Sequence, residues 1–480
     1  MKKLSLILAL AILASAALSC GETVTNEVTT LTDEVEPVEE NPDPLPEDLA
    51  FDGQTVNFYS CDYIYNRDYA VNFVTEENGE VLNDAQYYTE LWVEDRLGIE
   101  IVETLGPEVV DDFDAEIRSL IMAQDTTYDI YTNMDRYMIT AVMNGMFIAT
   151  SDLPYVNLDA EYWNPKATSR FSVGHKIYYT MTSFNLCSYS NTNAIFMNAD
   201  IADEMRLDGI YDLVRDGKWT YDKLKEYAQA AYRDLNGNTA PDLGDQFGFC
   251  PGSGKNAWVN AVVGAGLSDD IMHKDSNDYF VYELSDKMYD VLEMYYNLVH
   301  EQYVYNGEGG VKFEETPHLF HDGKLSDMLG YRELEFDFSV LPIPKYDESQ
   351  DSYYCRTYDT FFTMVPTTCT KTELCGAALE ALSYKAHTDL LPAYINDTLQ
   401  VKLVRDEESA EMIRIALDTR TISLAEAYMF SLWGNQNLYS NYICGTNSSP
   451  ASYIDSVKTQ TETQIAEMNE TFKELIDSQR

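Results

Sequence analysis

Apolar residues recur along this chain with two distinct periods. Short runs of β-branched and aromatic residues, bounded by polar or glycine-rich stretches, are typical of strands. Longer segments in which apolar residues recur every three or four positions are typical of amphipathic helices. In the first part of the chain the predicted strands are 54–60, 99–103 and 128–131, and the predicted helices are 83–97 and those that begin at 111 and 135. This alternation predicts an α/β lobe with a largely parallel sheet.

The alternation then resumes, so we expect this chain of 480 residues to form two or more structural units. The later predicted strands are 176–182, 193–198 and 361–365. The later predicted helices are 220–232, 258–267, 285–299, 406–418, 453–476 and one that begins at 370. Ligands of open α/β sheets sit beyond the carboxyl ends of the strands. Tyr63, which follows the first strand, and Asp135 and Arg136, which follow the third, are therefore candidate ligand contacts.

The first 20 residues have the composition of a secretory signal peptide. Two lysines precede an apolar run at 4–18, and small residues lead to Cys20. Ala17-Leu18-Ser19-Cys20 resembles the bacterial lipoprotein box, in which the cysteine is acylated and becomes the mature N-terminus. No later stretch is long and apolar enough to span a bilayer. We therefore expect a lipoprotein at the cell membrane that faces outside and is held by its lipid alone.

Residues 21–50 are rich in Thr, Glu and Pro, and we expect them to form a disordered acidic tether. The formal net charge of −49 repels nucleic acid and anionic lipid headgroups, which excludes them as partners. Tyrosine is common, with 36 residues, and its flat apolar face and polar edge suit both sugar rings and protein contacts. Most of these tyrosines are expected in the core or on an ordinary surface.

Removing Cys20 from the eight cysteines leaves seven, an odd number. An exported protein can form disulfides, but nothing in the spacing specifies a pairing. We expect most of these cysteines to be buried as small apolar residues.

The oxygen-rich stretch 234–245 resembles a calcium-binding loop of the EF-hand type. Oxygen donors stand at loop positions one, three, five, seven, nine and twelve, as Asp234, Asn236, Asn238, the backbone carbonyl of Ala240, Asp242 and Asp245. Calcium takes roughly six to eight oxygens, and this alternation directs them at one centre. The stretch departs from the EF-hand pattern at Thr239, where Gly is usual, and at Asp245, where Glu is usual. We expect a structural Ca²⁺, and the alternative is a polar turn between a helix and a strand.

Five local features, taken in order, resemble the extracellular solute-binding proteins of bacterial ABC importers, in the maltose-binding-like carbohydrate branch (solute-binding protein family 1). They are the lipoprotein start, Gly174-His-Lys-Ile-Tyr-Tyr running into Asn193-Ala-Ile-Phe-Met-Asn-Ala-Asp, the Asp234 loop ahead of Gln-Phe-Gly, Phe320-x-x-Gly323-Lys, and Val340-Leu-Pro-Ile-Pro. The resemblance covers nearly all of the chain after residue 50.

The resemblance implies a two-lobe periplasmic-binding-protein-like fold of type II, in which each lobe is a mixed sheet flanked by helices and the ligand lies between the lobes. Lobe one would comprise 51–185 and 312–357. Lobe two would comprise 186–311 and 358–480, including the calcium-type loop.

The resemblance also implies which residues contact the ligand. The family's polar contacts after its third strand correspond to Asp135 and Arg136, and its aromatic contacts correspond to Tyr331 and Trp433. Trp258 is a further candidate, with a core position as the alternative reading. Such side chains suit a neutral sugar, because aromatic faces stack on the ring while acids and arginine bind its hydroxyls.

The function implied is capture of an oligosaccharide outside the cell and its delivery to the permease subunits of an ABC transporter, by a monomer that performs no chemistry. One alternative is a secreted glycan-active hydrolase, although no Gly-x-Ser-x-Gly, HExxH or phosphate-loop motif occurs. Others are a binding protein for a peptide or another polar solute, and a scaffold or adhesin.

Overall fold

The computed structural model describes residues 43–479, apart from 66, 179, 271, 308, 397–398, 400–406 and 429–437. The predicted signal peptide, Cys20, most of the predicted tether and Trp433 lie outside the described residues. Within the described residues, no helix combines the length and the apolar character that crossing a membrane requires.

The first lobe is built on a sheet with the strand order β11-β3-β1-β2. Its strands are β1 (Gln54–Ser60), β2 (Ile99–Leu105), β3 (Ile130–Met134) and β11 (Phe361–Met364). β1 pairs in parallel with β2 and β3, whereas β11 runs antiparallel to β3. The helices of this lobe are α2 (Arg67–Ala70), α3 (Val81–Leu97), α4 (Val110–Met122), α5 (Asp135–Met143), α6 (Pro165–Thr168), α7 (Cys187–Ser190) and α14 (Thr372–Lys385). The predicted strand–helix alternation and parallel pairing are confirmed.

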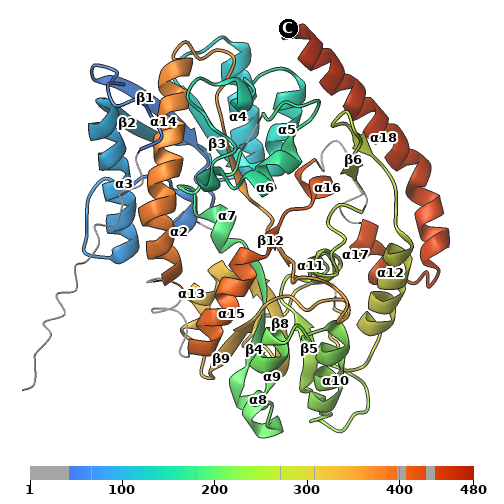
Figure 1. The fold of residues 1–480 in the computed structure, drawn as a ribbon. Helices are drawn as coiled ribbons and strands as arrows, with labels where there is room; N and C mark the ends of the chain where they lie inside the picture. The colour runs from blue at the N-terminus through green and yellow to red at the C-terminus, as the bar shows by residue number, and fades with distance from the viewer. Residues whose placement is uncertain are drawn as a thin grey trace, which may run out of the picture. The chain divides into compact units, whose positions relative to one another are not determined.

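The second lobe is built on a sheet with the order β5-β8-β4-β9 (Figure 1). Its strands are β4 (Asn193–Asn198), β5 (Phe247–Pro251), β8 (His318–Lys324) and β9 (Phe338–Leu341). β4 is antiparallel to both β8 and β9, and β5 is parallel to β8. The helices of this lobe are α8 (Ala199–Met205), α9 (Ile210–Arg215), α10 (Tyr221–Ala231), α11 (Asn256–Gly264), α12 (Asp286–Val299), α13 (Met328–Tyr331) and α15 (Glu407–Asp418).

The remaining described elements lie around the two sheets. They are β6 (His273–Lys274), β7 (Phe280–Val281), β10 (Cys355–Arg356), β12 (Arg420–Thr421), α16 (Leu424–Ala427), α17 (Leu438–Ile443) and α18 (Pro450–Ser478). β10 and β12 pair in parallel, and α17 packs against α11 and α12. The long α18 contacts both α5 and α12, so it lies against elements of both lobes.

The predicted division of the later chain between the lobes is wrong. β8 and β9, which fall within the 312–357 segment assigned to lobe one, pair with β4 in the second sheet. β11, which falls within the 358–480 segment assigned to lobe two, pairs with β3 in the first sheet, and α14 packs on α3. Strand-forming composition predicts β11 but not β8 or β9, and the lobe of each is decided by hydrogen-bonding partners that are distant in sequence.

Two further predictions differ from the structure. The predicted strand at 176–182 makes only isolated bridges among the described residues, such as that between Thr180 and Thr363. The start of the folded region lies earlier than residue 51, because Leu45 is buried. Arg96, in the last turn of α3, donates to the backbone carbonyls of Pro46 and Leu49 at 2.8 and 3.2 Å. These bonds hold the residues just before 51 against the first lobe.

A buried carboxylate on α14 anchors the chain between α5 and the second lobe. Glu380 accepts hydrogen bonds from the Trp163 indole at 2.7 Å, from the Tyr162 hydroxyl at 2.5 Å and from the Asn157 amide at 3.1 Å. Trp163 is fully buried. Because hydrogen bonds to charged groups are the stronger ones, this cluster fixes the position of the segment that leads toward the crossing between lobes.

Candidate ligand-binding site

Two crossing segments, 191–193 and 357–360, connect the lobes and lie side by side. The Thr192 and Thr357 hydroxyls are 3.3 Å apart, and Asn193 donates to the Arg356 carbonyl at 2.9 Å. Two cavities adjoin these segments. The larger, of about 1040 Å³, has Thr357 in its lining, and the smaller, of about 620 Å³, has the next residue, Tyr358. Successive residues of an extended segment point to opposite sides, so the crossing segments separate the two cavities.

The smaller cavity lies beyond the carboxyl ends of two strands, one from each lobe. Tyr63 follows β1, and Gly252 and Ser253 follow β5. This is the position at which open α/β sheets bind ligands. Tyr331 and Tyr358 contribute further aromatic rings to the lining.

Asp359 is the ionic centre of this region. Its carboxylate pairs with Arg136 from the first lobe and, at 3.0 Å, with the Lys324 ammonium from the second. Burial alone would raise the pKa of Asp359, but the two cations hold it at about 2. The Asp359 backbone has a φ of 54°, a conformation rare outside glycine, and Asn191 donates to its carbonyl at 2.9 Å. The crossing segments therefore hold this strained residue in place between the two cations.

Cations also lie over the ring of Tyr358. The Lys324 nitrogen is 3.9 Å and the Arg356 guanidinium carbon 4.1 Å from the ring centroid. Arg356 in turn pairs with Glu426. These contacts fix the orientation of the Tyr358 ring in the cavity wall.

Asp322 fixes the loop that follows β5. Its buried carboxylate accepts from the Gly252 amide at 2.8 Å, from the Asn260 side chain at 3.0 Å and from the Ser253 hydroxyl. Burial raises its pKa to about 6. A Cβ on Gly252 would lie 2.3 Å from Nε2 of His321, so only glycine allows this close approach. The second-lobe wall is therefore rigid and formed partly by backbone.

Neutral imidazoles extend that wall. His318 lies 2.7 Å from the Thr316 carbonyl through Nδ1 and 3.0 Å from Nδ1 of His321 through Nε2. The ring of His321 stacks on that of Phe313 at 4.7 Å. Burial lowers the pKa of both histidines, that of His318 to about 4, so both are uncharged at neutral pH. This part of the wall offers flat, uncharged surfaces.

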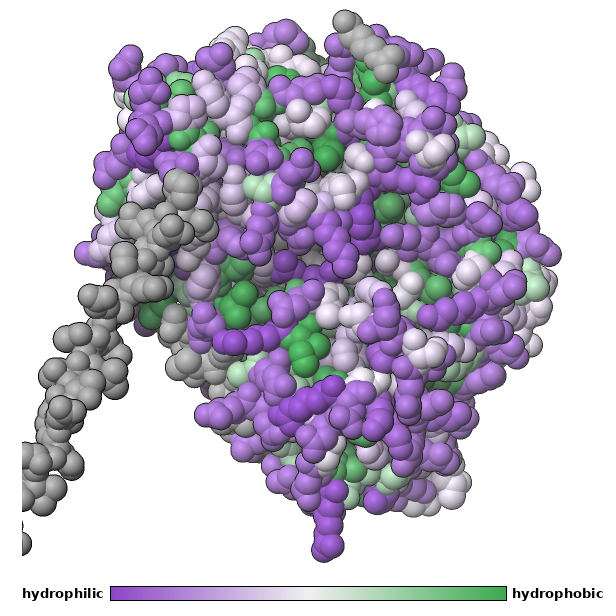
Figure 2. Space-filling view, viewed as in Figure 1, coloured by the Kyte–Doolittle hydropathy of each residue, from purple (hydrophilic) through white to green (hydrophobic). Residues whose placement is uncertain are grey.

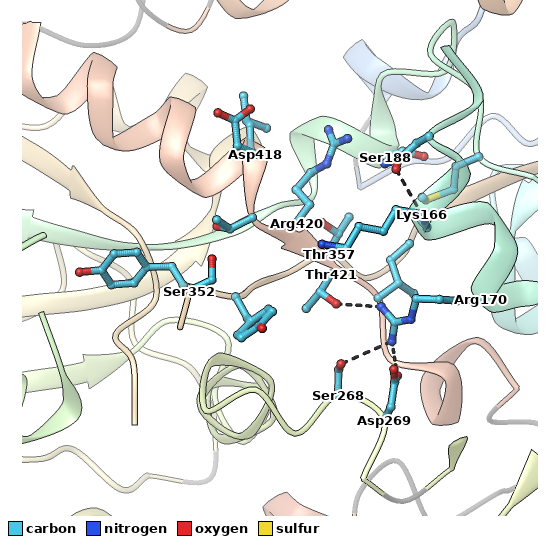
Figure 3. Close-up of a pocket in the computed structure, with 18 of the residues that line it drawn as sticks. Lys166, Arg170, Ser188, Ser268, Asp269, Ser352, Thr357, Asp418, Arg420 and Thr421 are labelled. Atoms are coloured by element: carbon cyan, nitrogen blue, oxygen red, sulfur yellow. Dashed lines mark hydrogen bonds and ion pairs between the residues drawn. The ribbon is translucent and has the colours of Figure 1, made fainter. Parts of the chain in front are cut away.

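The larger cavity is crossed by Arg170 (Figure 3). This first-lobe side chain donates to Thr421 at 2.9 Å and pairs with Asp269 of the second lobe. Beside it, the Arg420 guanidinium lies 3.8 Å from the centroid of the Tyr189 ring. The space-filling view shows a recess near the middle of a mostly polar face (Figure 2). Because Arg170 is used in contacts between the lobes, we assign this cavity a structural role.

No protein-family model and no curated protein matches the sequence, but solved structures do. An uncharacterised protein from Listeria monocytogenes EGD-e matches with a TM-score of 0.58 and 15% identity, over 86% of this chain and 100% of that one. An ABC substrate-binding protein from Listeria monocytogenes, in complex with cycloalternan, matches with a TM-score of 0.53 and 12% identity, over 88% and 100%. The maltose/maltodextrin-binding domain from Bdellovibrio bacteriovorus, bound to maltotriose, matches with a TM-score of 0.52 and 11% identity, over 86% and 100%.

This chain has the two-lobe fold of the ABC solute-binding proteins. The predicted fold class is confirmed. At such low identity the likeness concerns the fold alone, so the chemistry of the site rests on the side chains of this chain.

Four of the predicted ligand contacts fall into two groups within this solute-binding fold. Tyr63 and Tyr331 line the smaller cavity. Arg136 pairs with Asp359, while Asp135 is buried and accepts from the Thr360 hydroxyl at 3.0 Å, so it supports the crossing segment.

Trp258 is a core residue. It is 2% exposed on α11, and its ring packs against Phe249 and Tyr295. An apolar helix face meets the second sheet at this position, so the core reading is the correct one. Trp433 lies outside the described residues.

Sequence reasoning missed Lys324, Tyr358 and Asp359. Lys324 ends the Phe320-x-x-Gly323-Lys motif, so a signal for it was present. Tyr358 and Asp359 gain their roles only because the chain crosses between the lobes at that point.

The stretch 234–245 forms a closed polar loop. Asp234 accepts from the Gly237 and Thr239 amides at 2.7 and 3.0 Å, and buried Asp245 accepts from the Leu235 amide at 3.2 Å. Thr239 has a φ of 62°, the backbone conformation for which EF-hand loops use glycine. The side-chain nitrogen of Asn236 donates to Asp242 at 2.9 Å. The backbone thus turns at position six, although the residue is threonine.

Replacing Asp359 by Asn leaves Arg136 and Lys324 without their shared counter-charge. We expect Asp359→Asn to lower the free energy of unfolding at pH 7 by about 3 kcal/mol, as when a buried ion pair loses one partner. The folded pKa of about 2 lies below the ordinary 3.8, so this stabilisation is present above about pH 4 and lost as the pH falls toward 2. Urea unfolding across this range should show the two proteins converging.

The control for this experiment is Asp203→Asn on α8, where the side chain is exposed. We expect this substitution to change stability by less than about 0.5 kcal/mol at any pH. A constant difference between wild type and Asp359→Asn from pH 7 to pH 2 would contradict the ionic role of Asp359.

Proposed function

We propose that this protein captures a carbohydrate outside the cell and delivers it to the permease subunits of an ABC transporter. The observation that supports this most directly is the cavity of about 620 Å³ at the strand ends, which is lined by residues of both lobes. Cavities of this size match small-molecule sites, and an oligosaccharide of a few units fits the range. Closure of two lobes on such a ligand gives a transporter one shape to recognise.

The lining has the mixture that a neutral sugar requires. Tyr63 and Tyr331 offer flat faces for the apolar side of a pyranose ring, while the Lys324 ammonium offers a hydrogen-bond donor and the Ser253 hydroxyl oxygen an acceptor for its hydroxyls. Two of the structural neighbours contain oligosaccharides, cycloalternan and maltotriose, which supports this ligand class.

The hydrogen bonds of the carboxylates in the smaller cavity fit a binding protein better than a hydrolase. A glycosidase needs one free carboxylic acid and one free carboxylate facing the substrate. The raised pKa of Asp322 alone would suit an acid, but its oxygens accept from Gly252, Ser253 and Asn260. Asp327 accepts from the Lys324 amide at 2.7 Å. Of the three carboxylates that line this cavity, Asp322 and Asp327 thus hold protein backbone in place, which leaves Glu314 without a second free carboxyl group.

The ligand proposal is tested with maltotriose, longer maltooligosaccharides and cyclic glucose oligosaccharides. We expect at least one of them to raise the melting temperature and to be recovered intact, because a ligand that binds only the folded state stabilises it. We expect Tyr331→Ala to weaken calorimetric binding roughly tenfold through loss of stacking, worth about 1.4 kcal/mol.

Two variants serve as controls. Tyr331→Phe keeps the stacking face and should bind nearly as the wild type does. Tyr88→Ala, at a half-exposed position on α3, should bind unchanged. Accumulation of hydrolysis products would overturn the receptor proposal. A melting shift with peptides or other polar solutes, but with none of the sugars, would assign another ligand class to the same cavity.

We further propose that the protein is a monomeric lipoprotein, anchored through Cys20 on the outer face of the cell membrane. The basis is the lysine-led apolar start and the small residues before Cys20. We expect the wild type to partition with membranes and to gain mass from acyl chains at Cys20. Cys20→Ser should appear in the soluble fraction, whereas Cys444→Ser should remain with membranes. Equal membrane association of Cys20→Ser would contradict the anchor.

We also propose that the loop 234–245 holds a structural calcium ion. Carboxylates, side-chain amides and a backbone carbonyl are the oxygen donors that calcium selects, and Asp234, Asn236, Asn238, Ala240, Asp242 and Asp245 supply them. Rotation of the Asn236 side-chain amide would turn its oxygen, in place of its nitrogen, toward Asp242 and the ion.

The calcium proposal predicts that a chelator lowers the melting temperature of the calcium-equilibrated protein. Saturation at about 100 times Kd would contribute roughly 2.7 kcal/mol to stability. Asp234→Ala combined with Asp242→Ala should abolish the sensitivity, while Asp203→Ala combined with Asp208→Ala, an equal change of charge at exposed sites, should preserve it. A wild-type melting curve that is identical with calcium and with chelator would contradict the calcium site and show that the loop is only a polar turn.

A further inference from the structure

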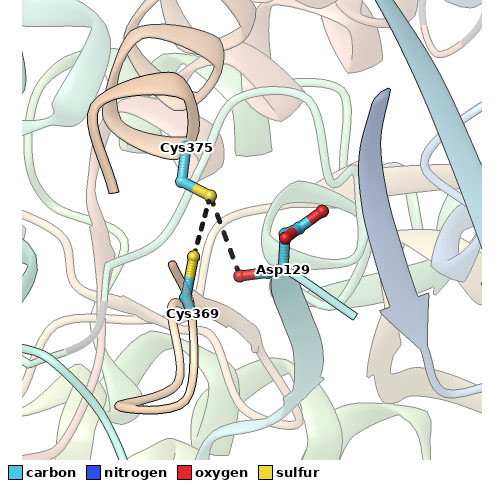
Figure 4. A group of neighbouring side chains, drawn as sticks. All are labelled: Asp129, Cys369 and Cys375. Atoms are coloured by element: carbon cyan, nitrogen blue, oxygen red, sulfur yellow. Dashed lines mark hydrogen bonds between the residues drawn. The ribbon is translucent and has the colours of Figure 1, made fainter. Parts of the chain in front are cut away.

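Two cysteines meet at the start of α14 (Figure 4). Cys369 lies in the turn between β11 and α14, and Cys375 lies in the first turns of the helix. Their sulfur atoms are 3.5 Å apart. The backbone of the turn is closed already, because the Cys375 amide donates to the Lys371 carbonyl at 2.9 Å and the Cys369 amide to Pro366 at 3.0 Å.

At this separation the two sulfurs are in van der Waals contact but not bonded. A disulfide needs sulfur atoms about 2.05 Å apart, with Cβ atoms about 3.8 Å apart. Rotation about χ1 of the two side chains is the motion that would bring the sulfurs together. The pair is therefore placed for oxidation in the folded protein.

The two thiols differ in a way that suits sequential exchange. Cys369 is partly exposed, and its sulfur accepts from the Lys371 amide at 3.3 Å, whereas Cys375 is buried and its thiol lies 3.9 Å from the Asp129 carbonyl, to which it donates. The hydrogen bond between the two thiols lowers the pKa of Cys369, and the same bond, together with burial, raises the pKa of Cys375. An accessible thiolate beside a buried thiol has the roles of attacking and resolving groups.

A metal site is the competing use of this cluster, because Asp129 lies beside both sulfurs. Its carboxylate is, however, already neutralised. Oδ2 of Asp129 accepts from the Asn57 amide at 2.9 Å and from the Lys371 ammonium at 3.0 Å. A bound cation would have to displace that ammonium or lie next to it, which costs electrostatic energy. The charges therefore favour a sulfur–sulfur bond over a metal.

We propose that Cys369 and Cys375 form an intramolecular disulfide. The Cys369 thiolate attacks one sulfur of an oxidant disulfide, which forms a mixed disulfide and releases one thiolate of the oxidant. Cys375 loses its proton and attacks the Cys369 sulfur, which forms the Cys369–Cys375 bond and releases the second thiolate. The two electrons leave with the oxidant, which ends as two thiols. In the cell this step relies on the proposed export, but in solution oxidised glutathione supplies the same chemistry.

The bond would fasten the turn before α14 to the helix itself. Lys371, between the two cysteines, also donates to the Thr55 carbonyl of β1 at 2.9 Å. The same helix carries Glu380, which anchors Trp163. The disulfide thus constrains the turn that follows the return of the chain from the second lobe to the first. It accounts for two of the seven cysteines other than Cys20.

A tryptic map of the full-length protein tests the proposal, because Lys371 separates the two cysteines. Cleavage yields peptides 357–371 and 372–385, each with a single cysteine. After incubation with oxidised glutathione and alkylation under denaturing conditions, we expect one cross-linked species of these two peptides that disappears on reduction. The oxidised protein should melt about 2 °C higher than the reduced one, because the cross-link restricts the unfolded chain.

Matched variants identify the partners. Cys369→Ser and Cys375→Ser should each abolish the cross-linked species and leave the other cysteine alkylated, while Cys444→Ser should leave the species unchanged. Recovery of both peptides with glutathione or the alkylating group attached would overturn the proposal. Protection of both thiols that only a chelator removes would overturn it in favour of a metal. The assay does not involve carbohydrate, so its outcome is independent of whether the cavity binds a sugar.

Discussion

The arrangement of this protein depends on one buried carboxylate at the junction of its lobes. Asp359 neutralises Arg136 from α5 and Lys324 from β8 while its own backbone adopts a left-handed conformation. Each of the three charges would be costly to bury alone. The three charges can pair with one another only when the crossing segment and both lobes are folded together. The ionic cluster therefore couples the relative position of the lobes to the wall of the smaller cavity.

Around that cluster, the cavity is built from rigid parts. Asp322 holds the loop after β5 through the Gly252 amide and the Ser253 hydroxyl, and Gly252 leaves room for His321. Tyr358 is oriented by the cations that lie over its ring. A site of this kind presents preorganised aromatic faces and donors, which lowers the entropy lost when a flexible ligand such as an oligosaccharide binds.

The larger cavity illustrates why size alone does not identify a binding site. Its Arg170 side chain is engaged across the lobes with Thr421 and Asp269, so a ligand there would compete with contacts that hold the protein together. In the smaller cavity the tyrosine faces are not needed to join the lobes. The position of that cavity at strand carboxyl ends also matches the direction in which a parallel sheet presents its loops.

Local pattern alone determined most of the long helices, several strands and part of the site. Apolar spacing located α3, α10 and α12 to within a few residues, and position after a strand selected Tyr63. Both the helix predictions and the choice of Tyr63 depend only on residues that are close together in the sequence. The tertiary structure decided which sheet β8, β9 and β11 join, because strand pairing is set by partners more than a hundred residues away. The tertiary structure also placed Trp258 in the core and Asp359 between two cations. Cys369 and Cys375 are close in sequence, but only the folded turn before α14 shows that their sulfurs are in contact.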